Sequence, residues 1–215
     1  MKSFVVIGLG RFGMQVARKL SQQGCEVLAL DISGDLVQQL GEVVTQAVIA
    51  DARDKEVLRS LGVKDFDCAV VAIGDSLSDS VLATLNLKEL GVPQIICKAH
   101  DETHRHVLEK LGADRVVIPE QENADRLAMS LASNNVLDYI ELSSDYGIIE
   151  VPVPASWENK SLIELNVRAK LGVNILSVKR GGSITVSPAA DYRMAKGDIM
   201  LVLGETAALE AVQKL

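Results

Sequence analysis

Apolar, β-branched segments alternate with helical patterns over residues 1–118. The segments fall at residues 4–7, 27–31, 47–50, 68–73, 94–97 and 115–118. Between them, apolar residues recur at helical spacing. One such pattern, which ends at Gly91, comprises Val81, Leu82, Leu85 and Leu90. Strands that alternate with amphipathic helices predict right-handed crossovers and a doubly wound parallel sheet of about six strands.

The pattern changes after this region. Pro119 ends the last of these strands, and a long helical pattern runs over residues 124–137. Short strand patterns follow at residues 139–142, 148–153, 174–179, 183–186 and 199–203. Turn sequences rich in Gly and Asp separate them, which predicts a mostly antiparallel sheet. We therefore expect two domains: residues 1–135, including a crossover helix, and residues 136–215, a smaller α/β domain.

Composition narrows the function classes. Of 215 residues 48% are hydrophobic, enough for a substantial core, but only 3% are aromatic, so aromatic stacking is not the expected means of holding a ligand. The net charge of −7 disfavours nonspecific binding to nucleic acid or to an anionic membrane. No apolar segment approaches the ~20 residues that span a bilayer, and no signal peptide is visible before the first strand. Cys25, Cys68 and Cys97 are interpreted as reduced core residues of a cytosolic protein.

A glycine-rich turn joins the first strand to the first helical pattern. Gly8 allows the tight turn, Gly10 lets the backbone approach a phosphate, and Gly13 lets the helix pack closely on the strand. The helix N-terminus offers N–H groups to an anion. Asp31 ends the second strand about 20 residues after Gly10, where a carboxylate accepts from ribose hydroxyls. The turn and Asp31 together predict a nucleotide site. The alternatives are an ordinary glycine turn and, for Asp31, an N-cap or turn acid.

Further polar residues fall at the carboxyl ends of the expected strands, where ligands bind in open α/β sheets. Arg11, inside the glycine turn, suits a ligand with more phosphate charge than a dinucleotide, or else is an exposed arginine at a helix start. Asp51 and Gly74 close the third and fourth strands and are candidate adenosine contacts. Asp75 and Ser76 fit either ligand contacts or helix caps.

Catalytic and metal-binding patterns are weak. His100 and His104 have the spacing of a helical metal face, and His106 lies nearby, but no third ligand is evident, so a surface helix is favoured. No serine stands in a nucleophile-elbow sequence. Residues 139–215 contain no acid–base constellation suited to hydride transfer, and no basic helix-turn-helix is visible.

Several motifs together resemble the RCK/KTN (TrkA-type) family, and within it the KtrA/KtrC-like regulatory subunits of bacterial Ktr potassium uptake systems. The motifs are VIGLGRFG at residues 6–13, the Leu-Asp pair that ends the second strand, VVAIG at 70–74, LGADRVVIPE at 111–120 and LNVRAKLGVNIL at 165–176. The resemblance covers both domains, and it implies an N-terminal RCK (KTN) domain and a C-terminal domain of the TrkA-C type.

The resemblance also implies residue roles in the first domain. The glycines would wrap the phosphates of ATP or ADP, with NAD(H) as an alternative ligand, and Arg11 would reach the terminal phosphate, including across a subunit interface. Glu120 would lie beside a divalent cation or sodium. Asp51 stands where near relatives have Asn. The full set of implied nucleotide contacts is Gly8, Gly10, Arg11, Phe12, Gly13, Asp31, Asp51, Gly74 and Lys98.

In the second domain, residues 162–176 resemble a cyclic di-AMP motif in which the usual aspartate is replaced by Asn166. Arg168 would meet a phosphate and Asn174 a base or sugar edge. The apolar bed would consist of Leu162, Ile163 and Ile175. The alternative from the residues alone is that Leu162, Ile163, Leu165 and Val167 are simply core.

The function that the resemblance implies is a non-enzymatic, cytoplasmic regulatory subunit at the inner face of the plasma membrane. It would form an octameric ring of dimers, bind no nucleic acid, and gate a membrane potassium-translocating subunit through ATP- and ADP-dependent ring conformations. The alternative is an NAD(P)-dependent oxidoreductase or an NAD(H) sensor.

Overall fold

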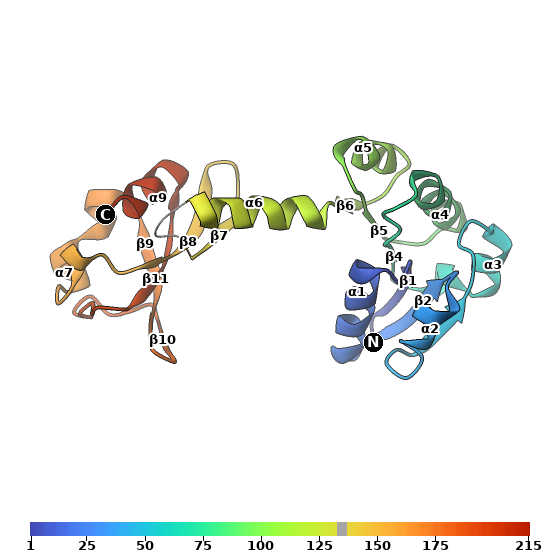
Figure 1. Ribbon diagram of the computed structural model, residues 1–215, viewed down its shortest axis with the longest axis horizontal. Coiled ribbons are helices and arrows are strands. Elements are labelled where there is room, and N and C mark those ends of the chain that lie inside the picture. Colours follow the sequence, from blue (N-terminus) through green and yellow to red (C-terminus); the bar gives the residue numbers. More distant parts are fainter. Residues whose placement is uncertain (133–136) are drawn as a thin grey trace. The chain divides into compact units, whose positions relative to one another are not determined.

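The expected parallel sheet forms from six strands of the described residues, 1–132 and 137–215 of this computed structural model (Figure 1). Its strands are β1 (Ser3–Ile7), β2 (Glu26–Asp31), β3 (Gln46–Ile49), β4 (Cys68–Val71), β5 (Ile95–Lys98) and β6 (Arg115–Val117). They pair in the order β3-β2-β1-β4-β5-β6, and every pairing is parallel. This order is the doubly wound, Rossmann-like arrangement, so the predicted fold class is confirmed.

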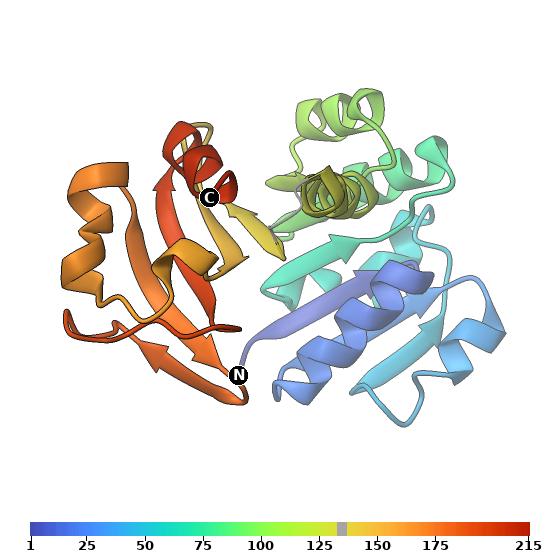
Figure 2. The ribbon, with the colours of Figure 1, turned by 60° about the vertical axis from the view of Figure 1, so that its left-hand side comes forward.

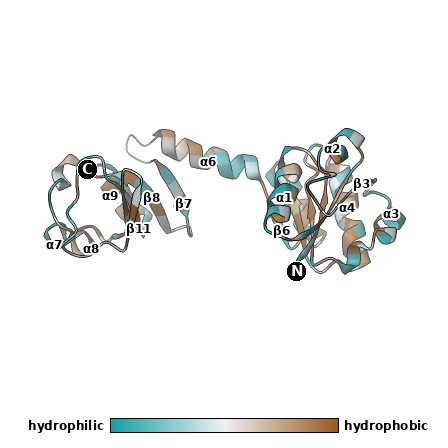
Figure 3. Ribbon diagram, turned by 90° about the horizontal axis from the view of Figure 1, so that it is seen from below, coloured by the Kyte–Doolittle hydropathy of each residue, from teal (hydrophilic) through white to brown (hydrophobic). Residues whose placement is uncertain are grey.

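Alternate residues of the strands lie in two separate hydrophobic cores, because successive side chains in a strand point to opposite faces of the sheet. Val5 and Ile7 belong to one cluster, which also contains Leu58, Leu87 and Leu108 from helices. The intervening Val6 belongs to a second cluster on the other face. Much of the interior of this unit is accordingly brown, the hydrophobic end of the scale, in Figure 3. Both faces of the sheet are therefore covered (Figure 2).

Helices cover the two faces of this parallel sheet. Their bounds are α1 (Arg11–Gln22), α2 (Gly34–Gln38), α3 (Lys55–Ser60), α4 (Leu77–Leu90) and α5 (Glu102–Lys110), with a 3-10 turn η1 (Val63–Asp65). Helix α4 was predicted correctly, but its buried face only in part: Val81 and Leu90 pack against the core as expected. Leu82 and Leu85 are exposed, and Ala83, Thr84 and Leu87 are buried instead. The buried face of α4 therefore combines small residues with Leu87, and Leu82 and Leu85 lie outside it.

The second unit has a five-stranded sheet, ordered β10-β9-β11-β8-β7, in which every pairing is antiparallel. Its strands are β7 (Asp138–Glu141), β8 (Tyr146–Pro152), β9 (Asn174–Arg180), β10 (Ser183–Val186) and β11 (Ile199–Glu205). Its other elements are η2 (Ala155–Trp157), α7 (Leu162–Leu165), α8 (Val167–Leu171) and α9 (Thr206–Gln213). Trp157, Met194 and Leu209 pack with the strands in one core. The predicted smaller antiparallel domain is confirmed.

Contacts divide the chain into Met1–Glu120 and Gln121–Leu215. The helix α6 (Pro119–Ala132) begins at this division. The domain boundary expected after residue 135 falls in residues 133–136, outside the described residues, and stays a prediction. Val136, part of the expected helical pattern, also lies there. Among the described helices, none combines the length and the apolar character needed to cross a bilayer.

Candidate nucleotide site

The glycine turn has the backbone geometry that its sequence predicts. Gly8 has φ +88°, a left-handed conformation that residues with a Cβ atom rarely adopt. A Cβ built on Gly13 would lie 1.9 Å from the carbonyl oxygen of Gly8, so only glycine fits where α1 passes the turn. Gly10 is the N-cap of α1 and has open space around it. The turn therefore leaves backbone and the helix N-terminus open to an anion.

Asp31 ties the turn to the end of β2. Its Oδ2 accepts a hydrogen bond from the backbone N–H of Leu9 at 2.6 Å, and its Oδ1 accepts one from Ser33 at 2.8 Å. A carboxylate has about four acceptor positions, so positions remain for ribose hydroxyls. The ribose role stays a prediction. The bond from Ser33, two residues on, is the turn contact that the alternative expected, whereas the bond from Leu9 is one that sequence reasoning missed.

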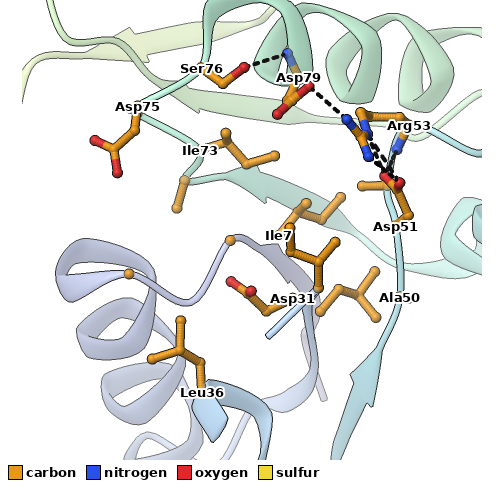
Figure 4. A pocket seen from close by; sticks show the side chains of 17 residues that line it. Ile7, Asp31, Leu36, Ala50, Asp51, Arg53, Ile73, Asp75, Ser76 and Asp79 are labelled. Carbon is orange, nitrogen blue, oxygen red and sulfur yellow. Dashed lines mark hydrogen bonds and ion pairs between the residues drawn. The ribbon is translucent and has the colours of Figure 1, made fainter. Parts of the chain in front are cut away.

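A cavity of about 300 Å³ opens at the carboxyl ends of the central strands (Figure 4). Among the predicted contacts, those that line it are Gly8, Gly10, Asp31, Asp51 and Gly74. Outside its lining lie Arg11, Phe12, Gly13 and Lys98. Apolar walls come from residues that include Ile7, Leu36, Ala50 and Ile73. The cavity thus combines an apolar interior with the exposed glycine turn.

Arg53 and its partner Asp79 line the cavity and were missed by sequence reasoning. Its guanidinium holds the Asp51 carboxylate, with Nη2 2.6 Å from Oδ2, and its Nη1 lies 3.3 Å from Asp79 Oδ1 on the first turn of α4 (Figure 4). Hydrogen bonds from the Arg53 side chain hold the pKa of Asp51 below its ordinary value. The pairing with Asp79 spans 26 positions, which no local pattern reveals.

Asp75 and Ser76 also line the cavity. Ser76 is the N-cap of α4 and accepts from the backbone N–H of Asp79, so its cap role is confirmed and its ligand role stays a prediction.

A second group of predicted residues gathers beside Gly74. Lys98 Nζ lies 2.7 Å from Glu120 Oε1 and 6.0 Å from the centre of the Phe12 ring. The Lys98 hydrogen bond is the main cause of a lowered pKa at Glu120, and the charge of Arg11 contributes. A Cβ at Gly74 would approach Lys98 Nζ to 3.2 Å. Arg11, the first residue of α1, is exposed. These residues form a charged rim outside the cavity.

The histidines are not a fully solvated face. His104 is buried on α5, and its Nδ1 lies 3.0 Å from Nδ1 of His100, which precedes the helix. Burial is the main cause of a lowered pKa at His104. Within the described residues, no three His, Cys, Asp or Glu side chains are grouped to hold a metal ion. The expectation of a simple surface helix is wrong for His104, because its ring packs inward.

In the second unit, the predicted cyclic di-AMP residues divide between core and surface. Leu162 and Ile175 are half-buried against the core. Arg168, on α8, and Asn174, at the start of β9, are exposed. Ile163 is 69% exposed, so the alternative in which it is simply core is wrong. Leu165 and Val167 are buried, as that alternative expected.

Two family models match the chain: the TrkA-N domain over residues 4–119 and the TrkA-C domain over residues 147–215. The chain is 43% identical over 213 residues to Ktr system potassium uptake protein C of Bacillus subtilis strain 168, covering 99% of this chain and 96% of the relative. It belongs to the Ktr potassium uptake protein family. Protein A of the same organism is 44% identical over 203 residues, covering 94% and 91%. The resemblance seen in the sequence is confirmed, and a Ktr protein is not an enzyme.

Solved structures agree on the fold. The GsuK channel matches with a TM-score of 0.71 at 20% identity, and the GsuK channel bound to NAD with 0.70 at 20%. Each match covers all of this chain but only 39% of the channel chain. At this identity the likeness shows the architecture of the Ktr chain alone.

Proposed function

We propose that this chain is a nucleotide-sensing regulatory subunit of a Ktr potassium uptake system. The observation that supports this most is the open cavity at the carboxyl ends of the parallel strands, with the glycine turn at one side and Asp31 at the end of β2. Membership of a potassium uptake family supplies the process that the ligand would regulate.

The proposed ligands are ATP and ADP. The nucleoside occupies the cavity, and the phosphates extend over Gly10 toward Arg11 and Lys98. Two cations on this rim suit a chain of phosphates better than the two bridging phosphates of NAD(H). NAD(H) remains the competing ligand, since the GsuK channel, which shares the fold, has been solved with NAD bound.

A cation site accompanies the phosphates in this proposal. Glu120 is 65% exposed and held by Lys98 alone among the described side chains. If Lys98 turns to a phosphate, Glu120 is freed to hold a divalent cation or sodium, which offsets repulsion between triphosphates of adjacent subunits. Replacing Glu120 with Gln would then make ATP binding less dependent on such cations.

Regulation would act through assembly. We infer an octameric ring of dimers under the membrane potassium-translocating subunit, at the cytoplasmic face of the plasma membrane. ATP would favour one ring geometry and ADP another, so that the ligand shifts the population of ring states.

A potassium flux assay tests this function. Proteoliposomes that hold the cognate translocating subunit are given the chain with ATP, with ADP or without nucleotide. We expect flux to differ between ATP and ADP, and the difference to vanish with Gly10→Ala. Flux that is the same in all three conditions would contradict a nucleotide-sensing role.

Cyclic di-AMP is a second proposed ligand, because Ile163, Arg168 and Asn174 are each exposed and the described residues form no ion pair with Arg168. A two-fold pair of small domains would match this two-fold symmetric ligand. Asn166 should weaken binding, since an amide orients an arginine less well than a carboxylate. Titration of cyclic di-AMP into the full chain should show saturable micromolar binding that Arg168→Ala removes and Lys170→Ala keeps.

A further inference from the structure

The order of the strands sets the order in which a nucleotide would lie along the cavity. The glycine turn follows β1, Asp31 ends β2, and Asp51 follows β3, and these three strands are neighbours about 4.8 Å apart. With the phosphates at the turn and the ribose at Asp31, as the proposed function has it, the base reaches the end of β3. Asp51 and Arg53 are the polar groups there.

The Asp51 carboxylate is almost filled by Arg53. Nε of Arg53 lies 2.9 Å from Oδ1 and 3.0 Å from Oδ2, and Nη2 lies 2.6 Å from Oδ2. The backbone N–H of Arg53 donates to Oδ1 as well, at 2.9 Å. A carboxylate offers about four acceptor positions, so little of this one is left for a ligand. The bond to Asp79 fixes the guanidinium from its other side.

This arrangement matters because two purines differ in the donors that they present. Guanine has an N–H and an amino group side by side, which pair with a free carboxylate through two parallel bonds. Adenine has a single amino group, which needs one acceptor. A carboxylate already held by an arginine fork has no free pair of oxygens for guanine but can still accept one bond.

We infer that Arg53 is a specificity-determining residue that excludes guanine nucleotides by occupying the Asp51 carboxylate. Arg53 is the only basic side chain among the described residues that line the cavity, so no other lining residue can replace it. The inference rests on the proposed nucleotide binding and adds its base preference. The competing role for Arg53 is a purely structural brace between the end of β3 and α4.

Calorimetric titration of ADP and GDP into the full chain separates these roles. In the unaltered chain we expect ADP to bind at least tenfold more tightly than GDP. Arg53→Ala should reduce that ratio about tenfold, chiefly because GDP binds more tightly. Arg53→Lys, which keeps the charge but loses the fork, should move the ratio in the same direction. Arg59→Ala, which removes an arginine paired with Glu56 on the surface of α3, is the matched control and should leave the ratio unchanged.

A second variant tests whether Arg53 acts on base preference through the Asp51 carboxylate. In a chain with Asp51→Asn, adding Arg53→Ala should give no further gain for GDP, because the carboxylate that guanine needs is absent. If Arg53 is only a structural brace, its replacement should lower ADP and GDP binding equally. An ADP-to-GDP affinity ratio that is unchanged in both Arg53 variants would overturn the inference but leave the proposed ADP binding in place. Absence of ADP binding to the unaltered chain would instead overturn the proposed function, and the inference with it.

Discussion

Arg11 occupies the first position of α1, directly after the N-cap, and its side chain is exposed. Its charge acts on Glu120, which is held by Lys98. Two cations and one carboxylate therefore stand together next to the glycine turn. In the proposed function, the distinction between ATP and ADP at this scale depends on which side chain meets the γ-phosphate.

Replacing Arg11 with Ala should weaken the binding of ATP more than the binding of ADP. Loss of one charge-assisted hydrogen bond to the γ-phosphate of ATP would cost roughly 1.5–3 kcal/mol, and ADP has no γ-phosphate. Calorimetry with both nucleotides measures the change in their affinity ratio. Lys19→Ala, near the other end of α1, is the control. An ATP-to-ADP ratio that Arg11→Ala leaves unchanged would remove Arg11 from this role.

The residues that sequence could place are those whose role follows from their position at a strand end. Asp31, Asp51 and Gly74 line the cavity for this reason. Arg53 could not be placed in the same way, because its contact with Asp79 depends on how α4 packs beside the end of β3. The residue pattern alone did not reveal the exposure of Ile163, since Leu165 and Val167 close by in the sequence are buried.

Two glycines of one turn should respond differently at the scale of the strand–helix element. Gly13→Ala forces a Cβ against the Gly8 carbonyl and should cost about 3 kcal/mol of unfolding free energy. Gly10→Ala meets nothing in the protein and should cost less than about 1 kcal/mol, yet it should abolish nucleotide binding by blocking the phosphate. Urea unfolding followed by circular dichroism, with ADP titration, measures both. Equal loss of stability in the two variants would contradict this geometry.

In the second unit, the buried carboxylate of Asp198, directly before β11, pairs with Arg180 at the end of β9. Asp198 is fully buried and accepts two bonds of 2.7 Å from Arg180, which is half exposed. These bonds are the main cause of the lowered pKa of Asp198. Arg180→Ala should therefore destabilise this unit by about 2–3 kcal/mol at neutral pH, because it leaves the buried Asp198 charge without its arginine partner.

The pH dependence of that loss has a definite sign. A lowered pKa gives stability that is present above the unfolded value, about 3.9, and lost as pH falls through the folded value. The difference between Arg180→Ala and the unaltered chain should shrink below about pH 4. Trp157, the single tryptophan, lies in this core and reports its unfolding by fluorescence. A pH-independent difference, or an equal loss in the control Lys179→Ala, would contradict the pairing.

Periodicity identified the elements better than it identified their faces. The strand positions were predictable because central parallel strands are continuous apolar runs. The face of α4 was not, because Ser80 and Thr84 are buried while Leu82 and Leu85 are exposed. A buried hydroxyl such as Thr84 is satisfied inside the helix by the carbonyl of Ser80, which hydropathy does not register.

At the scale of the whole molecule, the two units have separate cores and, in the proposed function, separate ligands. Ktr membership and the doubly wound parallel sheet could be predicted from the sequence because motifs and alternation extend along the chain. The proposed assembly could not be derived from periodicity, since it would depend on surfaces of other copies and of a membrane partner.

The central claim is that the first unit binds adenine nucleotides as its regulatory ligands. The most direct test is a side-by-side calorimetric titration of ATP, ADP and NADH into the full chain, with Gly10→Ala as the negative control. We predict saturable binding of ATP and ADP, weaker binding of NADH, and no binding by the variant. Absence of saturable ATP and ADP binding, or NADH binding as tight as either, would contradict the account.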